Sequence, residues 1–281
     1  MADGSYRWQG FAPEPDPARV EAIEAACDPA GAADFAEPAR AAALDRLDAA
    51  LAAARDEASG EGAGRVTEAR DRLRALDPAA LEPRRGLFGL FDSRKRRLRD
   101  FRDAYRRAAA DLTQAAGDLS AGAEATARRS AGLDAVWTEI RDALVELDAH
   151  RLAARRRLDG QSPATEEGPH PLAIRMEALD ACRAAALAAL PLIRGVQNAD
   201  ARGAEAMKAC ANGLEEWRQS WLEALGLAGK RPKKVRPDRP GLLASRDAAT
   251  ARLERAMTEL GASRDRRAQV IDRLAALRAG L

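Results

Sequence analysis

Apolar residues recur at helical spacing along most of the 281-residue chain, and the longest such pattern covers residues 93–158. Every seventh position from Leu98 is apolar or nearly so: Leu98, Tyr105, Leu112, Leu119, Thr126, Leu133, Ile140, Leu147 and Ala154. A sustained heptad stripe of this kind is typical of a coiled-coil-like helix. The pattern therefore predicts a long helix that begins after an N-cap at Asp92 or Ser93.

The second apolar position of the heptad changes register in the middle of this segment. It includes Phe101 and Ala108 in the first half, and Trp137 and Leu144 in the second. The stripe is weak in between, so we expect a kink or a short break between about residues 120 and 133. The stripe can pair within the chain or with a second copy, and a homo-oligomer through residues 98–158 is one of the assemblies that the sequence allows.

The rest of the chain reads as shorter helices separated by Gly- and Pro-rich breaks. We expect Pro191 to kink or end a helix and Gly261 to turn the last two helices into a hairpin. The expected helices cover about residues 17–27, 38–58, 66–76, 171–190, 200–225, 242–260 and 264–279. The expected organisation is a disordered N-terminus (1–16), an N-terminal helical region with a basic and aromatic loop (17–92), a helical core (93–227), a basic linker (228–241) and a C-terminal helical hairpin (242–281).

The composition narrows the fold class further. The chain has 68 alanines but only 7 valines and 5 isoleucines, and aromatic residues make up 4%. Strands depend on β-branched and aromatic residues, so a sheet is nearly excluded, together with the common Rossmann, P-loop and α/β-hydrolase enzymes. We predict an all-α protein, an elongated helical bundle built on a long, kinked, coiled-coil-like helix.

Charge and targeting signals bear on location and partners. The 46 basic and 44 acidic residues give a formal net charge of +2, which argues against bulk or sequence-specific nucleic-acid binding. No signal peptide and no run of 18 apolar residues is visible in the sequence. We expect a cytoplasmic protein, which could also lie at the inner face of the membrane.

Three stretches resemble, in order, the TelA-type toxic anion (tellurite) resistance family. The first is GLFGLFDSRKRRLRDFRDAYRRAAADL (86–112), and the second is LDAVWTEIRDALVELDAHRL (133–152). The third, residues 189–227, contains LPLIR followed by Gln197-Asn198, then Trp217 and a final ALGL. The resemblance covers roughly a third of the chain. It does not extend to residues 1–80, and the family's Thr-Asn-x-Leu-Leu-type helix is missing after residue 241.

This resemblance implies an all-helical cytosolic protein associated with resistance to tellurite and other toxic agents. We accordingly expect a non-enzymatic stress-response protein that acts through protein–protein contacts with partners that the sequence does not identify. An alternative is a peripheral adaptor that binds anionic lipid through residues 84–99.

Two groups of residues are candidates for contacts with a partner or ligand. In residues 84–99, basic residues next to aromatic ones are typical of membrane-surface segments, although the aromatic residues could also form a hydrophobic staple beside solvated arginines. The basic residues of 230–239 form either a flexible patch that binds phosphates or an acidic partner, or a solvated linker. These candidate membrane or anion contacts are Phe88, Phe91, Arg94, Lys95, Arg96, Arg97, Lys233 and Lys234. The second group, candidate partner or ligand contacts, contains Arg194, Gln197, Asn198, Trp217 and Trp221. Its alternative interpretation is an inter-helix turn capped by Asn198 and Asp200, with both tryptophans in the core.

We expect no catalytic residue, no cofactor and no metal site. Cys182 and Cys210 could meet across a helix seam, but without a CxxC motif a buried structural pair is favoured over a redox pair. His150 follows Glu146 by one helical turn without a second histidine nearby, which favours a surface pair over a metal site.

Overall fold

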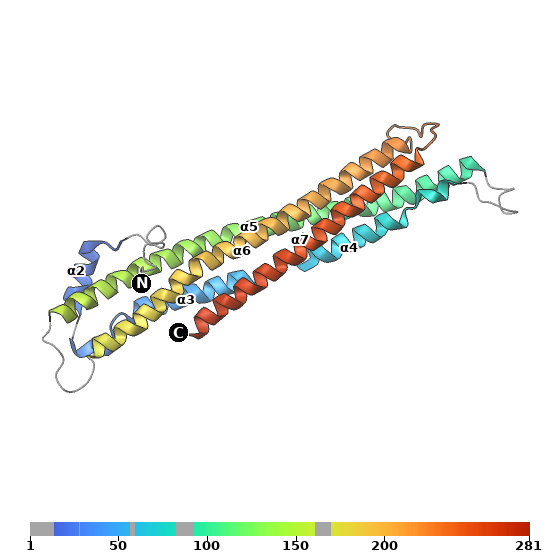
Figure 1. The fold of residues 1–281 in the computed structure, drawn as a ribbon. Helices are drawn as coiled ribbons and strands as arrows, with labels where there is room; N and C mark the ends of the chain where they lie inside the picture. The colour runs from blue at the N-terminus through green and yellow to red at the C-terminus, as the bar shows by residue number, and fades with distance from the viewer. Residues whose placement is uncertain (1–13, 28, 57–59, 83–92, 161–169) are drawn as a thin grey trace. The chain divides into compact units, whose positions relative to one another are not determined.

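The computed structural model describes residues 14–27, 29–56, 60–82, 93–160 and 170–281, and all of its elements are helical (Figure 1). The predicted all-α helical bundle is therefore confirmed. The elements are α2 (Pro17–Ala26), the 3-10 helix η1 (Pro29–Asp34), α3 (Glu37–Arg55), α4 (Gly60–Ala75), the 3-10 helix η2 (Pro78–Leu81), α5 (Arg94–Asp159), α6 (Pro171–Ala224) and α7 (Arg239–Ala279).

Helix α5 is the predicted long helix, and it is continuous. Ser93 caps it, since the Ser93 Oγ accepts a hydrogen bond of 3.2 Å from the backbone N–H of Arg96. All residues between 120 and 133 are helical, so the expected short break does not occur. Of the nine heptad residues, Leu98 is partly buried and the others are buried within the chain. An assembly of two copies through this stripe would require the chain's own helices to leave it.

Helix α6 is also continuous, which corrects the prediction of two helices separated near Pro191. The turn capped by Asn198 and Asp200 does not form, because both residues lie inside the helix. Proline inside a helix removes one backbone hydrogen bond and introduces a steric clash. Leu190 and Ile193, which lie next to Pro191 in α6, are fully buried. The free energy gained from burying them outweighs the cost of the proline.

The predicted C-terminal hairpin is wrong as well, because α7 runs through Gly261 without a turn. A glycine inside a helix costs only about 1 kcal/mol relative to alanine. Leu253, Leu260 and Leu274 are buried at intervals of seven and fourteen residues, so one face of a single helix is used throughout. Helix α4 likewise begins at Gly60, inside the Gly-rich stretch that was expected to form a break.

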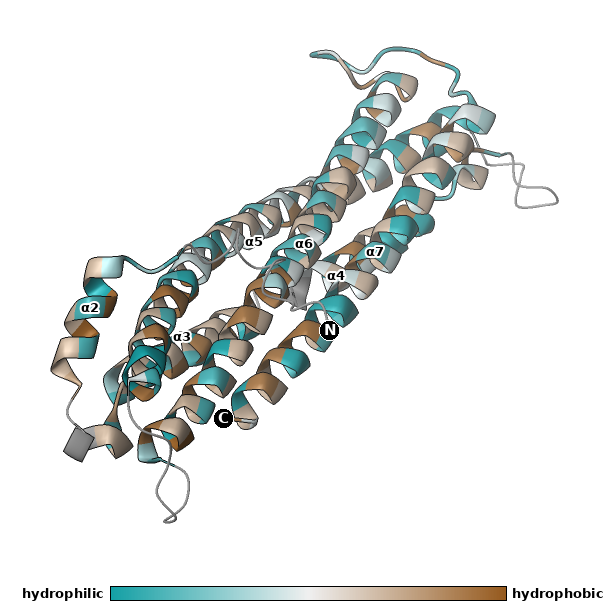
Figure 2. Cartoon of the chain, turned by 60° about the vertical axis from the view of Figure 1, so that its left-hand side comes forward, coloured by the Kyte–Doolittle hydropathy of each residue, from teal (hydrophilic) through white to brown (hydrophobic). Residues whose placement is uncertain are grey.

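The chain divides into two compact units, and α5, α6 and α7 contribute to both. Unit 1 contains the described residues up to Asp56 together with 129–198 and 266–281, and unit 2 contains those of 57–128 and 199–265. In unit 1, α3 packs against parts of α5, α6 and α7. The short α2 and η1 pack in smaller clusters on the last part of α5. Hydrophobic and hydrophilic residues occupy different sides of individual helices (Figure 2), as expected for amphipathic helices. The main core of unit 1 includes Leu47, Ala50, Ile140, Leu144, Leu190, Ile193 and Leu274.

In unit 2, α4 packs against the first part of α5, the second part of α6 and the first part of α7. Its core includes Val66, Leu73, Tyr105, Leu112, Leu119, Met207, Trp217, Trp221, Leu253 and Leu260. The rings of Trp217 and Trp221 lie 5.2 Å apart between centroids, and the Tyr105 hydroxyl donates a 2.7 Å hydrogen bond to the Arg218 carbonyl. Among the residues that the structure describes, most of the aromatic side chains, Phe101 included, therefore lie in the core of unit 2.

Candidate anion-binding groove

Two basic segments that are distant in the sequence line one groove of about 1280 Å³ on unit 2. One wall is the beginning of α5, and the other is the loop between α6 and α7. Among the described residues of the lining, Asp103 is the only acidic one. The lining residues are Ser93, Arg94, Lys95, Arg96, Leu98, Arg99, Arg102, Asp103, Arg106, Pro232, Lys233, Lys234, Val235 and Arg236. The sequence-predicted candidates Arg94, Lys95, Arg96, Lys233 and Lys234 are thus brought together.

The loop wall begins at a glycine that ends α6. Gly226 has φ +67°, a left-handed conformation that favours glycine. The N–H of Leu227 donates to the Leu222 carbonyl at 2.8 Å, and the N–H of Gly226 donates to the Glu223 carbonyl at 2.9 Å. This pair of bonds is a Schellman motif, which turns the chain out of the helix. A Cβ atom on Gly226 would lie 2.8 Å from Val235 Cγ1, so the loop packs directly on this residue.

The loop is then fastened to α5 by one arginine. The Nε and Nη2 atoms of Arg102 donate to the Leu225 carbonyl at 2.8 and 2.6 Å, and Nη2 also donates to the Lys233 carbonyl at 2.7 Å. The Lys233 N–H donates to the Gly226 carbonyl at 2.8 Å. Partial burial, and secondly the neighbouring Arg106, lower the pKa of Arg102. The loop is therefore anchored to α5 and to the end of α6 at Leu225, Gly226 and Lys233.

The helix wall places cations at an unfavourable position. The first turn of α5 contains Arg94, Lys95, Arg96 and Arg97 and no acidic residue, although the N-terminus of a helix carries a partial positive charge. The Arg97 Nε reaches the Leu81 carbonyl at 3.4 Å. An anion bound at this wall would relieve the repulsion that these like charges impose.

Few carboxylates neutralise the groove. Asp100 lies 3.8 Å from Arg96 and 3.5 Å from Arg99, and Asp103 pairs with Arg106 at 2.9 Å. These pairs are exposed and therefore weak. Within the described part of the chain, no carboxylate pairs with the side chains of Arg94, Lys95, Lys233, Lys234 and Arg236.

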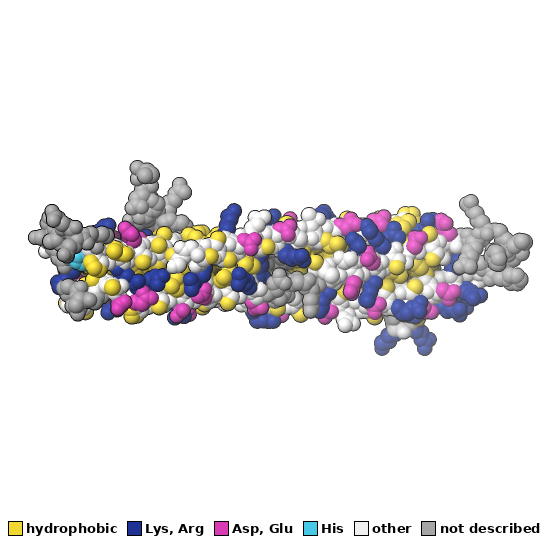
Figure 3. Space-filling view, turned by 90° about the horizontal axis from the view of Figure 1, so that it is seen from below, with side chains coloured by type: hydrophobic (Ala, Val, Ile, Leu, Met, Phe, Trp, Pro, Cys, Tyr) yellow, Lys and Arg dark blue, Asp and Glu magenta, His cyan; other side chains and the backbone are white. Residues whose placement is uncertain are grey.

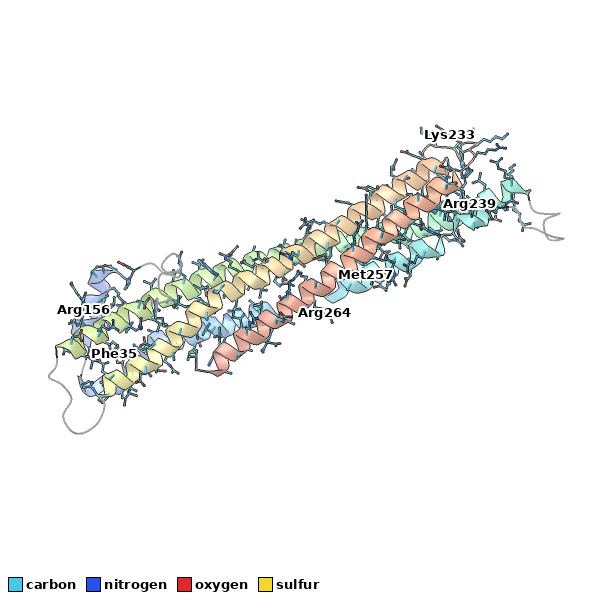
Figure 4. All side chains as sticks on the ribbon, in the orientation of Figure 1. Phe35, Arg156, Lys233, Arg239, Met257 and Arg264 are labelled. Atoms are coloured by element: carbon cyan, nitrogen blue, oxygen red, sulfur yellow. The ribbon has the colours of Figure 1, made fainter. Side chains whose placement is uncertain are left out.

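The surrounding surface accentuates this local charge. Figure 3 shows Lys and Arg side chains gathered at the right of the view, whereas basic and acidic side chains mix elsewhere on that face. Lys233 lies on the loop that follows α6, and Arg239 lies at the start of α7 (Figure 4). The Arg239 guanidinium forms an ion pair with Glu82, so its charge is already compensated within unit 2.

The other candidate contact group consists mostly of structural residues. Arg194 forms an ion pair with Asp134 of α5 and lies 4.7 Å from the Trp137 ring centroid. The Gln197 Nε2 donates to the Ser130 carbonyl at 2.7 Å and to Asp134 Oδ1 at 3.1 Å. Hydrogen bonds from Gln197 and Arg194 lower the pKa of Asp134. Both polar side chains therefore hold α6 to α5 within unit 1.

The remaining members of that group do not form a ligand site. Asn198 is exposed, whereas Trp217 and Trp221 are only 2% and 0% exposed and cannot contact a partner. The expected contact role of the two tryptophans is thus wrong, and their alternative interpretation as core residues is confirmed.

The thiols are placed where they cannot act as a pair. Cys182 and Cys210 lie on the same helix, 28 residues or about eight turns apart, and each belongs to the core of a different unit. They therefore do not meet across a seam. Burial raises the pKa of Cys182 and raises that of Cys210 to about 11, which disfavours the reactive thiolate.

The histidines have local structural partners. The His150 Nδ1 lies 2.9 Å from the Glu146 carbonyl, and the Glu146 carboxylate pairs with Arg19. His170 caps α6, since its Nδ1 accepts a 3.1 Å hydrogen bond from the Leu172 N–H. No group of three or more potential metal ligands occurs among the described residues.

Two candidates, Phe88 and Phe91, lie outside the described residues. Conversely, sequence reasoning missed Arg102 and Arg106 as lining residues. A signal for the α5 members was present, because Lys95, Arg99, Arg102 and Arg106 recur at intervals of three and four residues and share one helix face.

Comparison of the chain with protein-family models, with curated proteins and with solved structures gives no match. In the described part of the chain, no helix combines the length and the apolar character needed to cross a membrane.

Proposed function

We propose that this chain is a non-enzymatic adaptor that binds an anionic membrane surface through the basic groove. The observation that carries the proposal is the convergence of two basic segments, whose members Arg102 and Lys233 are 131 residues apart in the sequence. Charges that gather on one surface in a nearly neutral chain favour binding to a surface rich in anions.

A membrane fits this groove better than a nucleic acid does. The formal net charge of +2 gives little long-range attraction to an extended polyanion, so binding depends on the local cluster. The helix wall follows directly after GLFGLF (86–91) in the sequence, and basic residues next to apolar ones are typical of membrane-surface segments. The proposed location is the cytoplasmic face of the membrane.

The resemblance to the TelA-type family adds a biological setting, a response to toxic anions through contacts with other proteins. The stretches 86–112, 133–152 and 189–227 support this part of the proposal. The groove would then bring the chain to the membrane, where such contacts are made.

Vesicle co-sedimentation tests the proposal. We expect the chain to pellet with phosphatidylcholine vesicles that contain phosphatidylglycerol, and to stay in the supernatant with pure phosphatidylcholine. The double variant Lys233→Glu/Lys234→Glu should bind at least about tenfold more weakly, because each basic residue near an anionic surface contributes about 1 kcal/mol.

The matched control is Arg202→Glu/Lys208→Glu, which changes the net charge equally at exposed positions of α6 outside the groove lining. It should bind nearly as well as the wild type. Equal loss in both variants would show that net charge alone matters and would refute the groove. Absence of wild-type binding would refute the membrane proposal, as would tighter binding to duplex DNA than to vesicles at the same salt concentration.

A further inference from the structure

The loop wall of the groove is held by hydrogen bonds to its backbone. Its lysine side chains take no part in these bonds. Arg102 binds the backbone carbonyls of Leu225 and Lys233, and the Lys233 N–H binds Gly226. The Lys233 and Lys234 side chains have no ion-pair partner among the described residues. The loop therefore presents its cations from a fixed backbone.

A fixed array of charges selects ligands differently from a flexible one. A flexible basic segment adapts to any surface and follows the average charge density. A preorganised array loses less conformational entropy on binding, but only with ligands whose charges match its own spacing. The anchored loop thus predicts discrimination between anions of equal total charge.

The two walls define which anion matches. Arg94, Lys95 and Arg99 come from α5, and Lys233 and Lys234 come from the loop. Each wall offers two lining cations with no carboxylate partner among the described residues, Arg94 and Lys95 on α5 and Lys233 and Lys234 on the loop. Two cations on one element suit one phosphate group, so a ligand with two linked phosphates can use both walls at once.

We infer that the groove prefers a lipid headgroup carrying two linked phosphates, diphosphatidylglycerol, over headgroups that carry one phosphate each. This inference depends on the proposed membrane binding and names the lipid class that the same groove selects. Arg102 is its positioning residue, because it holds the loop wall against the helix wall.

The test compares two vesicle surfaces with the same number of phosphates. Phosphatidylcholine vesicles contain either diphosphatidylglycerol or twice the molar fraction of phosphatidylglycerol, and binding is measured by co-sedimentation. We expect the wild type to bind the first about tenfold more tightly, the gain from about one additional charge-assisted contact.

Two pairs of variants separate positioning from charge. Arg102→Gln and Arg106→Gln remove the same charge from the groove lining, but only Arg102 fastens the loop. Gly226→Ala disturbs the loop with no change of charge, whereas Gly229→Ala finds no atom closer than 3.9 Å. Arg102→Gln and Gly226→Ala should reduce the preference for diphosphatidylglycerol to nearly one, whereas Arg106→Gln and Gly229→Ala should keep this preference. Phosphatidylglycerol binding should fall by the same factor in Arg102→Gln and Arg106→Gln, because both remove one positive charge from the lining.

Each outcome decides a separate point. Equal wild-type binding to both surfaces overturns the lipid preference but leaves the proposed membrane binding intact. Binding to neither surface overturns the proposed function itself. A preference retained by both Arg102→Gln and Gly226→Ala, with unchanged circular dichroism, would show that the anchored loop does not create it.

Discussion

Arg267 is a charged side chain that is only 5% exposed, and it lies in unit 1. Its Nε and Nη2 donate to the Ala54 carbonyl at 3.1 and 2.5 Å, and Nη2 also donates to the Asp56 carbonyl at 2.6 Å. The last carbonyls of a helix lack partners within the helix. Arg267, which is distant in the sequence, donates the hydrogen bonds that these carbonyls at the end of α3 lack.

Replacing Arg267 with Met should lower the free energy of unfolding by about 2 kcal/mol, because buried carbonyls lose charge-assisted hydrogen bonds. Urea unfolding followed by circular dichroism measures this. The neighbouring Arg266→Met removes the same charge from an exposed position and should change stability by no more than about 0.5 kcal/mol. Equal effects of the two substitutions would contradict the capping role.

The sequence does not distinguish Arg267 from its neighbours. The segment SRDRRAQV (263–270) contains three arginines, and their chemistry is identical. Which of them is buried depends on the face of α7 that meets α3, and this is a property of the tertiary structure. By contrast, the sequence did predict the Ser93 cap, because capping depends on residues adjacent to the helix.

At the scale of elements, the heptad stripe of α5 was predictable because burial follows helical periodicity. The sequence failed where helices were expected to stop. Pro191 and Gly261 are local signals for a break, and both lie inside continuous helices. Each costs a few kcal/mol at most, and buried leucines and isoleucines on either side compensate for this cost. Whether a helix continues through such a residue depends on tertiary packing, which local propensity does not report.

Pro191 provides a direct test of this balance. The residue is exposed, so Pro191→Ala removes little packing and restores an N–H that can bond to the Leu187 carbonyl. We expect the variant to raise the free energy of unfolding by about 1–3 kcal/mol in urea titrations. The control is Ala201→Pro, at another exposed position of α6. This substitution should lower the free energy of unfolding by a similar amount. A destabilising Pro191→Ala would indicate that packing of α6 requires the proline.

At the scale of the whole molecule, the sequence identified both basic segments but not their convergence. Residues 94–97 and 233–234 were candidates on composition alone. That they form one groove depends on α6 packing beside α5 in unit 2 and on Arg102 fastening the loop. Pairing between distant segments follows from the assembled core, so no local pattern could have predicted it.

The same separation of local and total charge predicts how salt acts. Raising ionic strength from about 0.01 M to about 0.1 M shortens the Debye length from about 30 Å to about 10 Å. Since the net charge is only +2, attraction to anionic vesicles comes mainly from the groove. We expect wild-type affinity for phosphatidylglycerol vesicles to fall at least about tenfold over this range, and that of Lys233→Glu/Lys234→Glu to change much less.

Stability should respond differently to the same change of salt. Many ion pairs of the described residues, such as Arg19–Glu146, Arg74–Glu254 and Arg106–Asp103, join exposed side chains and contribute little. The free energy of unfolding should therefore shift by less than about 1 kcal/mol. Vesicle binding and urea unfolding, measured in the same buffers, check both expectations. Salt-independent vesicle binding would mean that apolar insertion, not the basic groove, holds the chain at the membrane. A parallel loss of stability and binding would mean that salt acts on the fold.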